Sequence, residues 1–144
     1  MNTNPSGLQR FIHAQETLYP YVLEELKRGR KTGHWMWFIF PQLKGLGHSS
    51  TADHYGIRDL EEAAEYLQHP VIGRRLVQVS NVLLSLSGRT ATQIFGSPDD
   101  LKLRSCMTLF SRVPGADPVF QQVLDRFYNG LPDKRTLIMS GISE

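Results

Sequence analysis

Apolar residues recur along most of the chain at the spacing of helices. In the segment 71–88 they fall every three or four positions, and Gly88 follows the last of them. The segment 103–110 has the same spacing, which places Cys106 on the core-facing side of a helix. Sustained alternation of apolar and polar residues, the pattern of a half-buried strand, is missing from the sequence. The pattern predicts an all-α protein, a single compact domain of about seven short helices over residues 1–144.

Several of these helices have recognisable starts. Asp59 with Glu62 three residues later has the form of a capping box. The run 97–100, Ser-Pro-Asp-Asp, combines a hydroxyl, a first-turn proline and acids beside the positive end of the helix dipole, and Asp117 with the proline after it repeats this pattern. Pro20 either kinks the first helical region or starts a second helix, because proline has no amide hydrogen and clashes with the preceding turn.

The densest apolar run is Trp35–Phe40, which stops at Pro41. A strand or a helix here would be apolar on all sides, and in a helical chain we expect a short buried helix that ends near Pro41. Each aromatic side chain here buries roughly 150–250 Å² when it enters a core, so we expect the run to be interior. Trp35 and Trp37 also carry an indole N–H that needs a partner, so one of them is expected to line a pocket at the edge of the core.

A glycine-rich polar loop, PQLKGLGHSS, follows the aromatic run. A glycine loop that enters a helix N-terminus is suited to binding phosphate or carboxylate, because free amides and the helix dipole point outward. The loop is not a P-loop, since its lysine precedes both glycines. An ordinary turn between two helices is the alternative interpretation. The loop residues that we expect to contact an anion are Lys44, Gly45, Gly47, His48 and Ser49.

Polar residues on two other segments extend this candidate site. Lys102 and Ser105 lie three residues apart on one side of the predicted helix, with Asp99 one turn earlier, and form either a solvated edge or one wall of a polar cleft. His34 opens the aromatic run, where it is either a residue at the edge of the core or an acid–base group. Cys106 is expected to be an inert core thiol rather than a nucleophile.

Composition excludes several classes of protein. The net charge of +2 is too small to favour a nucleic-acid-binding protein. The single cysteine excludes an internal disulfide, and the five histidines have no metal-ligand spacing, so neither a metal nor another cofactor is expected. The longest apolar run has six residues against the roughly 20 that span a bilayer, and the N-terminus lacks a signal-peptide pattern, so we expect no membrane partner and a cytoplasmic protein.

Two motifs give the chain a resemblance to a known family. HWMWFIFPQ at residues 34–42 and SPDDLKLRSCMTLF at residues 97–110 resemble the bacterial family called domain of unknown function 1810, and the similarity extends from about Leu8 to Thr136. The resemblance implies a compact, single-domain, all-α fold. It implies no established activity, cofactor or catalytic residue. Pro20 departs from the helix former that is usual at this position.

The sequence leaves three functional hypotheses. The first is a site for a small anionic ligand such as a nucleotide or a phosphorylated metabolite, with or without enzymatic activity. The second is a protein-interaction module or homo-oligomer that uses the aromatic run as a hot spot. The third and weakest is nucleic-acid binding through the basic stretch Lys27–Lys31. The ligand site of the first hypothesis comprises His34, Trp35, Trp37, Lys44, Gly45, Gly47, His48, Ser49, Lys102 and Ser105.

Overall fold

The computed structural model describes residues 7–142, and this part of the chain forms ten helices and no strand. The helices are α1 (Gln9–Gln15), α2 (Tyr19–Lys27), α3 (Met36–Ile39), α4 (Ser50–Tyr55), α5 (Leu60–Gln68), α6 (Ile72–Ser85), α7 (Ala91–Phe95), α8 (Asp99–Ser111), α9 (Val119–Tyr128) and α10 (Lys134–Met139). The predicted all-α class is therefore confirmed. The helices outnumber the seven predicted because short ones such as α7 and α10 carry too few residues to show a clear periodicity.

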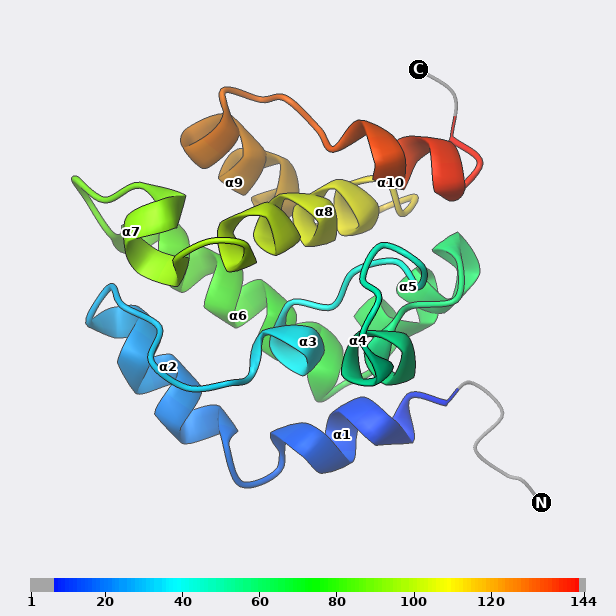
Figure 1. Cartoon of the computed structure of the whole chain (residues 1–144), viewed down its shortest axis with the longest axis horizontal. Coiled ribbons are helices and arrows are strands. Elements are labelled where there is room, and N and C mark those ends of the chain that lie inside the picture. Colours follow the sequence, from blue (N-terminus) through cyan, green and yellow to red (C-terminus); the bar gives the residue numbers. More distant parts are fainter. Residues whose placement is uncertain (1–6, 143–144) are drawn as a thin grey trace.

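Two long helices, α6 and α8, organise the packing. Helix α6 packs against α2, α5 and α9, while α8 packs against α5, α7, α9 and α10. In Figure 1, α8, α9 and α10 lie along one side of the molecule and α1 and α2 along the opposite side, with α6 between them. Most of the apolar positions that the sequence pattern assigned to these helices, including Leu76 in α6 and Cys106 in α8, are buried in the central cluster, whereas Val71 just before α6 is exposed.

The helix starts follow the predicted signals with small shifts. Pro20 lies in the first turn of α2, so it begins a second helix instead of kinking the first. The Asp59 carboxylate accepts a hydrogen bond from the Glu62 backbone N–H at 2.9 Å. Helix α8 begins at Asp99 without a side-chain cap, so Ser97 does not cap it.

The aromatic run forms the predicted short buried helix. Helix α3 ends at Ile39, and Trp35 and Phe40 on either side of it are buried. The Phe40 ring lies 5.7 Å from the ring of Phe95, edge to face, which anchors the run against α7. Within the run, Trp37 remains partly exposed. The prediction that the run is mostly interior is therefore confirmed.

An isolated parallel bridge between Leu43 and Ile57 positions the loop that follows α3. The Lys44 N–H donates to the Ile57 carbonyl at 2.8 Å, and the Ile57 N–H donates to the Gln42 carbonyl at 2.9 Å. These two bonds hold residues 42–44 beside the segment that leaves α4. The loop before α4 therefore has a fixed course next to α8 and α10 (Figure 1).

Candidate functional site

A cavity of about 340 Å³ lies where α8, the start of α10 and the loop before α4 meet. We call it the Lys102 cavity. Its walls bring together three segments that are far apart in the sequence. The described residues that line it are Gln42, Leu46, Gly47, Pro98, Leu101, Lys102, Arg104, Ser105, Asp133 and Arg135.

The walls of the Lys102 cavity carry more positive than negative charge. Lys102, Arg104 and Arg135 are cations, and Asp133 is the one carboxylate among the described residues that line the cavity. That carboxylate already caps α10, because its Oδ2 accepts hydrogen bonds from the Thr136 N–H at 3.0 Å and from the Thr136 hydroxyl at 2.6 Å. The cavity walls therefore present three cations to an anion, and their one described carboxylate, Asp133, is already hydrogen-bonded as a helix cap.

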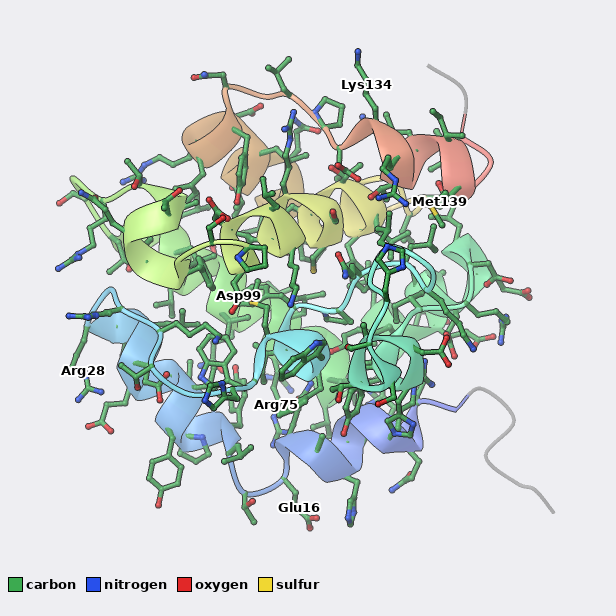
Figure 2. The ribbon with its side chains drawn as sticks, in the orientation of Figure 1. Glu16, Arg28, Arg75, Asp99, Lys134 and Met139 are labelled. Atoms are coloured by element: carbon green, nitrogen blue, oxygen red, sulfur yellow. The ribbon has the colours of Figure 1, made fainter. Side chains whose placement is uncertain are left out.

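Lys102 belongs to a charge network with two residues that do not line the cavity, Asp99 and Lys31. Its Nζ is 3.3 Å from Asp99 Oδ1, while Asp99 Oδ2 is 2.9 Å from the Nζ of Lys31. The Lys31 ammonium also donates to the Gly33 carbonyl at 2.6 Å. Asp99 lies in the space between α8 and the segment that leads into α3 (Figure 2). One carboxylate thus serves two ammonium groups, and the network keeps a net positive charge.

Each lysine of this network lies over an indole ring. Lys102 Nζ is 5.2 Å from the centroid of the Trp37 ring, and Lys31 Nζ is 5.1 Å from that of Trp35. Both distances are in the range of cation–π attraction. The two tryptophans face different surroundings, however. Trp37 is partly exposed and lies beside Lys102, outside the set of residues that line the Lys102 cavity, whereas Trp35 is buried and donates its Nε1–H to Glu25 Oε1 at 2.9 Å.

The Glu25 carboxylate is the polar partner that orients Trp35. The same Oε1 accepts hydrogen bonds from the backbone N–H groups of Thr32 at 2.8 Å and Gly33 at 3.0 Å. Burial of the Glu25 carboxylate acts to raise its pKa, but these N–H bonds and the indole N–H bond outweigh that effect, so the pKa lies below its usual value. Glu25 therefore keeps Trp35 turned toward α2 and away from the Lys102 cavity.

A second hollow, which we call the aromatic hollow, lies on the other side of Trp37. It has a volume of about 470 Å³ and is more open than the Lys102 cavity. A narrow hollow of about 10 Å³ lies between the two: it shares Trp37 and Tyr55 with the aromatic hollow, and Gln42 and Lys102 with the Lys102 cavity. The described residues that line the aromatic hollow are His34, Trp37, Phe38, Ser50, Thr51, His54 and Tyr55.

The structure brings half of the predicted ligand-binding residues to these two hollows. Gly47, Lys102 and Ser105 line the Lys102 cavity, and His34 and Trp37 line the aromatic hollow. The stripe that places Lys102 and Ser105 on one wall is the one that the helical spacing predicted.

The other five predicted residues lie outside both sets of lining residues. Lys44 is exposed and its Nζ is 3.8 Å from Asp53 Oδ1. Ser49 is the N-cap of α4, since its hydroxyl oxygen accepts a hydrogen bond from the Ala52 N–H at 3.0 Å. The remaining three are Trp35, Gly45 and His48.

Two arginines of the cavity were missed by the sequence analysis. The Arg104 guanidinium donates to the carbonyls of Leu131 at 2.9 Å and Pro132 at 3.1 Å, which fixes its position on the wall. Arg135 lies in the first turn of α10, two residues after the cap Asp133. A proline and an aspartate before a basic pair form a helix-start signal that could have located α10, but the sequence does not show that α10 lies beside α8.

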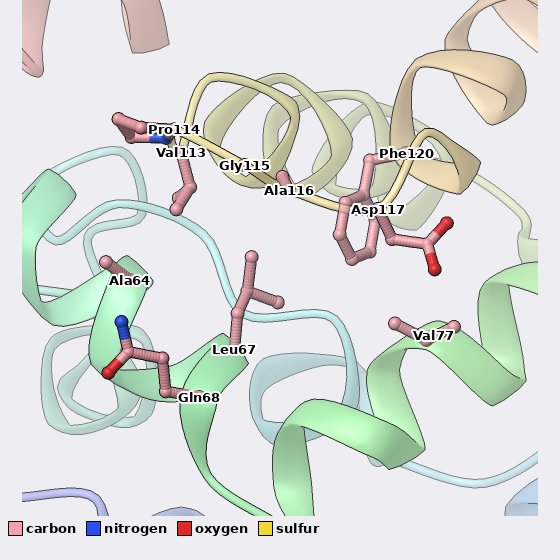
Figure 3. Close-up of a pocket in the computed structure, with 10 residues that line it drawn as sticks. All are labelled: Ala64, Leu67, Gln68, Val77, Val113, Pro114, Gly115, Ala116, Asp117 and Phe120. Atoms are coloured by element: carbon pink, nitrogen blue, oxygen red, sulfur yellow. The ribbon is translucent and has the colours of Figure 1, made fainter.

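Another cavity, of about 250 Å³, lies between α5, α6 and the loop after α8 (Figure 3). Leu67 and Phe120 project into it, and its described lining residues include no cation. The one carboxylate among them, Asp117, accepts a hydrogen bond from the Val119 N–H at 2.9 Å and so caps the start of α9. With a carboxylate and no cation among its described lining residues, this cavity does not suit an anion.

Nucleophilic cysteine chemistry has no support in the structure. Cys106 is buried in α8, and burial raises the pKa of its thiol well above the usual value. A neutral, buried thiol is neither reactive nor accessible. Cys106 is therefore a core residue, as its position on the apolar side of the predicted helix indicated.

The fold and the cavity define a compact helical protein with a cationic cavity on one face. A comparison with protein families matches residues 5–139 to the family described as protein of unknown function (DUF1810), and the chain belongs to this family. Among solved structures, it is similar to the conserved hypothetical protein Rv1873 from Mycobacterium tuberculosis. The two are 49% identical over 96% of this chain and 99% of that chain, with a TM-score of 0.94.

A comparison with curated proteins gives no match. Within the described residues, every helix is too short or too polar to cross a membrane.

Proposed function

We propose that the Lys102 cavity binds a small anionic ligand, such as a nucleotide or a phosphorylated metabolite. The observation that carries this proposal is the charge of the cavity walls. Lys102, Arg104 and Arg135 face a volume of about 340 Å³, and the single carboxylate among the described lining residues, Asp133, is used as a helix cap. Cavities of this size are typical of small-molecule sites.

Arg135 is the cation best placed to receive the ligand. Within residues 7–142, no hydrogen bond or ion pair holds its guanidinium, whereas Arg104 is held by two carbonyls and Lys102 by Asp99. A guanidinium binds phosphate or carboxylate through two parallel N–H donors. Arg135 would therefore bind the anion, and Lys102 would add a point charge from the opposite wall.

The burial of the aromatic run is the reason to prefer a ligand site over an interaction surface. Trp35 and Phe40 and all of α3 except Trp37 are buried in the core, so the run presents little apolar area to another protein. An interface hot spot needs large side chains that a partner can cover. Trp37, the one partly exposed residue of the run, lines the aromatic hollow, so it is not free to form a broad apolar interface either.

The test measures the melting temperature of the wild type and of two variants, Arg135→Ala and Lys44→Ala. Each protein is measured with inorganic phosphate, pyrophosphate, nucleotides and sugar phosphates. We expect at least one of these anions to raise the melting temperature of the wild type. Arg135→Ala should reduce the affinity for that anion by about 10- to 100-fold, because a hydrogen bond to a charged group contributes about 1.5–3 kcal/mol. Arg135 is exposed, so the variant should fold normally.

Lys44→Ala is the matched control, since it removes an exposed cation of the loop before α4 that does not line the cavity. It should bind as the wild type does. The proposal is wrong if none of the anions shifts the wild type, or if the Arg135 variant responds as strongly as the Lys44 variant.

A further inference from the structure

Exposed apolar side chains lie on segments that help to form the Lys102 cavity: α8, the segment before α10 and α10 itself. Four of the large apolar residues that are most exposed in the described part of the chain are Ile138 at 75%, Leu131 at 58%, Leu101 at 56% and Met139 at 43%. Single exposed apolar residues are normal on protein surfaces, whereas a group around one cavity marks a binding surface. We call these four side chains the apolar rim.

Two of the rim residues are tied to residues that line the cavity, and a third is tied to the loop before α4, which supplies part of the lining. Leu101 is itself a lining residue. The backbone carbonyl of Leu131 accepts the hydrogen bond from Arg104, so Leu131 sits beside that wall. Met139 reaches the loop before α4, because its Cε would lie 2.9 Å from a Cβ added to Gly45, and Figure 2 shows this side chain directed toward that loop.

Helical geometry connects Ile138 to the same side. Arg135 lines the cavity, and Ile138 and Met139 follow it at i+3 and i+4 in α10. Residues at these spacings lie on one side of a helix. One side of α10 therefore carries both a cation that lines the cavity, Arg135, and two exposed apolar side chains, Ile138 and Met139.

We propose that the natural ligand is an amphiphilic anion: a molecule with one phosphate or carboxylate group in the Lys102 cavity and an apolar chain or ring that lies on the apolar rim. This inference rests on the proposed function, since it assigns the ligand class of the same site. Charge complementarity places the anionic group on the cationic wall, and the rim then covers the apolar part. Neither a bare phosphate nor a wholly polar phosphometabolite would use the rim.

The ligand is bound as a single molecule and not as part of a membrane. Surfaces that bind anionic membranes through charge carry clusters of about four to eight exposed basic residues. Here the described lining residues supply three cations, and two of them are already held, Lys102 by Asp99 and Arg104 by two carbonyls. Three cations around one cavity suit the anionic group of a single molecule better than a membrane surface.

The test is a titration of the wild type with inorganic phosphate and with methyl, butyl and hexyl phosphate by isothermal titration calorimetry. Each methylene that becomes fully buried should tighten binding about fourfold, so hexyl phosphate should bind at least about tenfold more tightly than methyl phosphate even with partial burial. Equal affinities across the series would overturn the inference while leaving the proposed anion site intact. No binding of any member, inorganic phosphate included, would remove both.

Two serine variants locate the apolar contact. Ile138→Ser should reduce the preference for hexyl over methyl phosphate by about threefold or more, and it should leave the affinity for methyl phosphate unchanged, since it removes apolar area and no charge. Leu18→Ser is the matched control, because Leu18 is also exposed, at 41%, and lies at the start of α2. It should keep the full preference.

Other outcomes count against the inference. If Ile138→Ser and Leu18→Ser behave alike, the chain of the ligand does not lie on the rim. Binding to vesicles of phosphatidylcholine with phosphatidylserine, without binding to monomeric hexyl phosphate, would show a membrane surface instead. Binding of an acidic, leucine-containing peptide, without binding of hexyl phosphate, would show a protein partner instead.

Discussion

Glu25 determines which way Trp35 faces. Its Oε1 accepts hydrogen bonds from the indole and from two backbone N–H groups, so the ring is fixed against α2. Trp37, two residues later, has no such acceptor among the described residues and lies beside Lys102. The sequence predicts that one of the two tryptophans of the run lines a pocket, but it does not say which, because the choice depends on a carboxylate ten residues before Trp35.

The Glu25 contact makes stability depend on pH. Because the pKa of Glu25 is lower in the folded chain than in the unfolded chain, its ionised form stabilises the fold above the unfolded pKa of about 4.5. That contribution disappears as the pH falls through the lower, folded pKa. Urea unfolding of Glu25→Gln should therefore show a deficit relative to wild type at pH 7 that shrinks below about pH 4.

The neighbouring Glu24→Gln is the control for this measurement. Glu24 is exposed, and none of the hydrogen bonds of the described residues involves its carboxylate. Its effect on the free energy of unfolding should be small and nearly independent of pH. A deficit for Glu25→Gln that stays constant from pH 7 to pH 3 would contradict the role assigned to the ionised carboxylate.

At the scale of elements, the long amphipathic helices and the short apolar helix α3 could be predicted, whereas other short helices such as α7 and α10 could not. The periodicity in 71–88 and 103–110 locates α6 and α8, and Asp59 marks the start of α5. Helix α10 has six residues and was missed, although it supplies Arg135 to the cavity. Short helices form mainly through tertiary packing, which a local pattern does not reveal.

Helix α6 approaches the end of α5 through a glycine. A Cβ added to Gly73 would lie 2.3 Å from the Leu67 carbonyl oxygen, a severe clash with backbone. At an exposed helical position glycine to alanine stabilises by about 1 kcal/mol. We expect Gly73→Ala instead to lower the free energy of unfolding in urea by about 1–3 kcal/mol, the cost of overpacking.

The exposed neighbour Arg74→Ala, in the same turn of α6, serves as the control and should change the free energy of unfolding by less than about 0.5 kcal/mol. If Gly73→Ala were as stable as the wild type or more so, the close approach of α5 and α6 would not be required by the fold.

At the scale of the whole molecule, one buried amide connects the helices of the N-terminal half. Gln15 at the end of α1 donates to the Phe38 carbonyl at 2.8 Å and to the Tyr66 hydroxyl at 3.1 Å, and its carbonyl accepts from Arg75 at 3.3 Å. These partners lie in α3, α5 and α6. This role could not be predicted from the sequence, because a glutamine on a helix is usually exposed.

Replacing this amide should weaken the fold as a whole. Gln15→Leu keeps a similar volume but leaves the buried Phe38 carbonyl and Tyr66 hydroxyl without a partner, so we expect a loss of about 1–3 kcal/mol in urea unfolding. The exposed Gln122→Leu on α9 is the control. If the urea midpoint of Gln15→Leu equalled that of the wild type, the amide would not contribute to the stability of the fold.

The network around Asp99 has a consequence for optical measurements on this protein. Its two ammonium groups lie over the two indoles, so both chromophores respond to one set of charges. An anion that draws Lys102 away from Asp99 alters the field at Trp37 directly, and at Trp35 through the shared carboxylate. The fluorescence of both tryptophans therefore depends on the arrangement of Lys31, Asp99 and Lys102, and neither tryptophan is an independent probe.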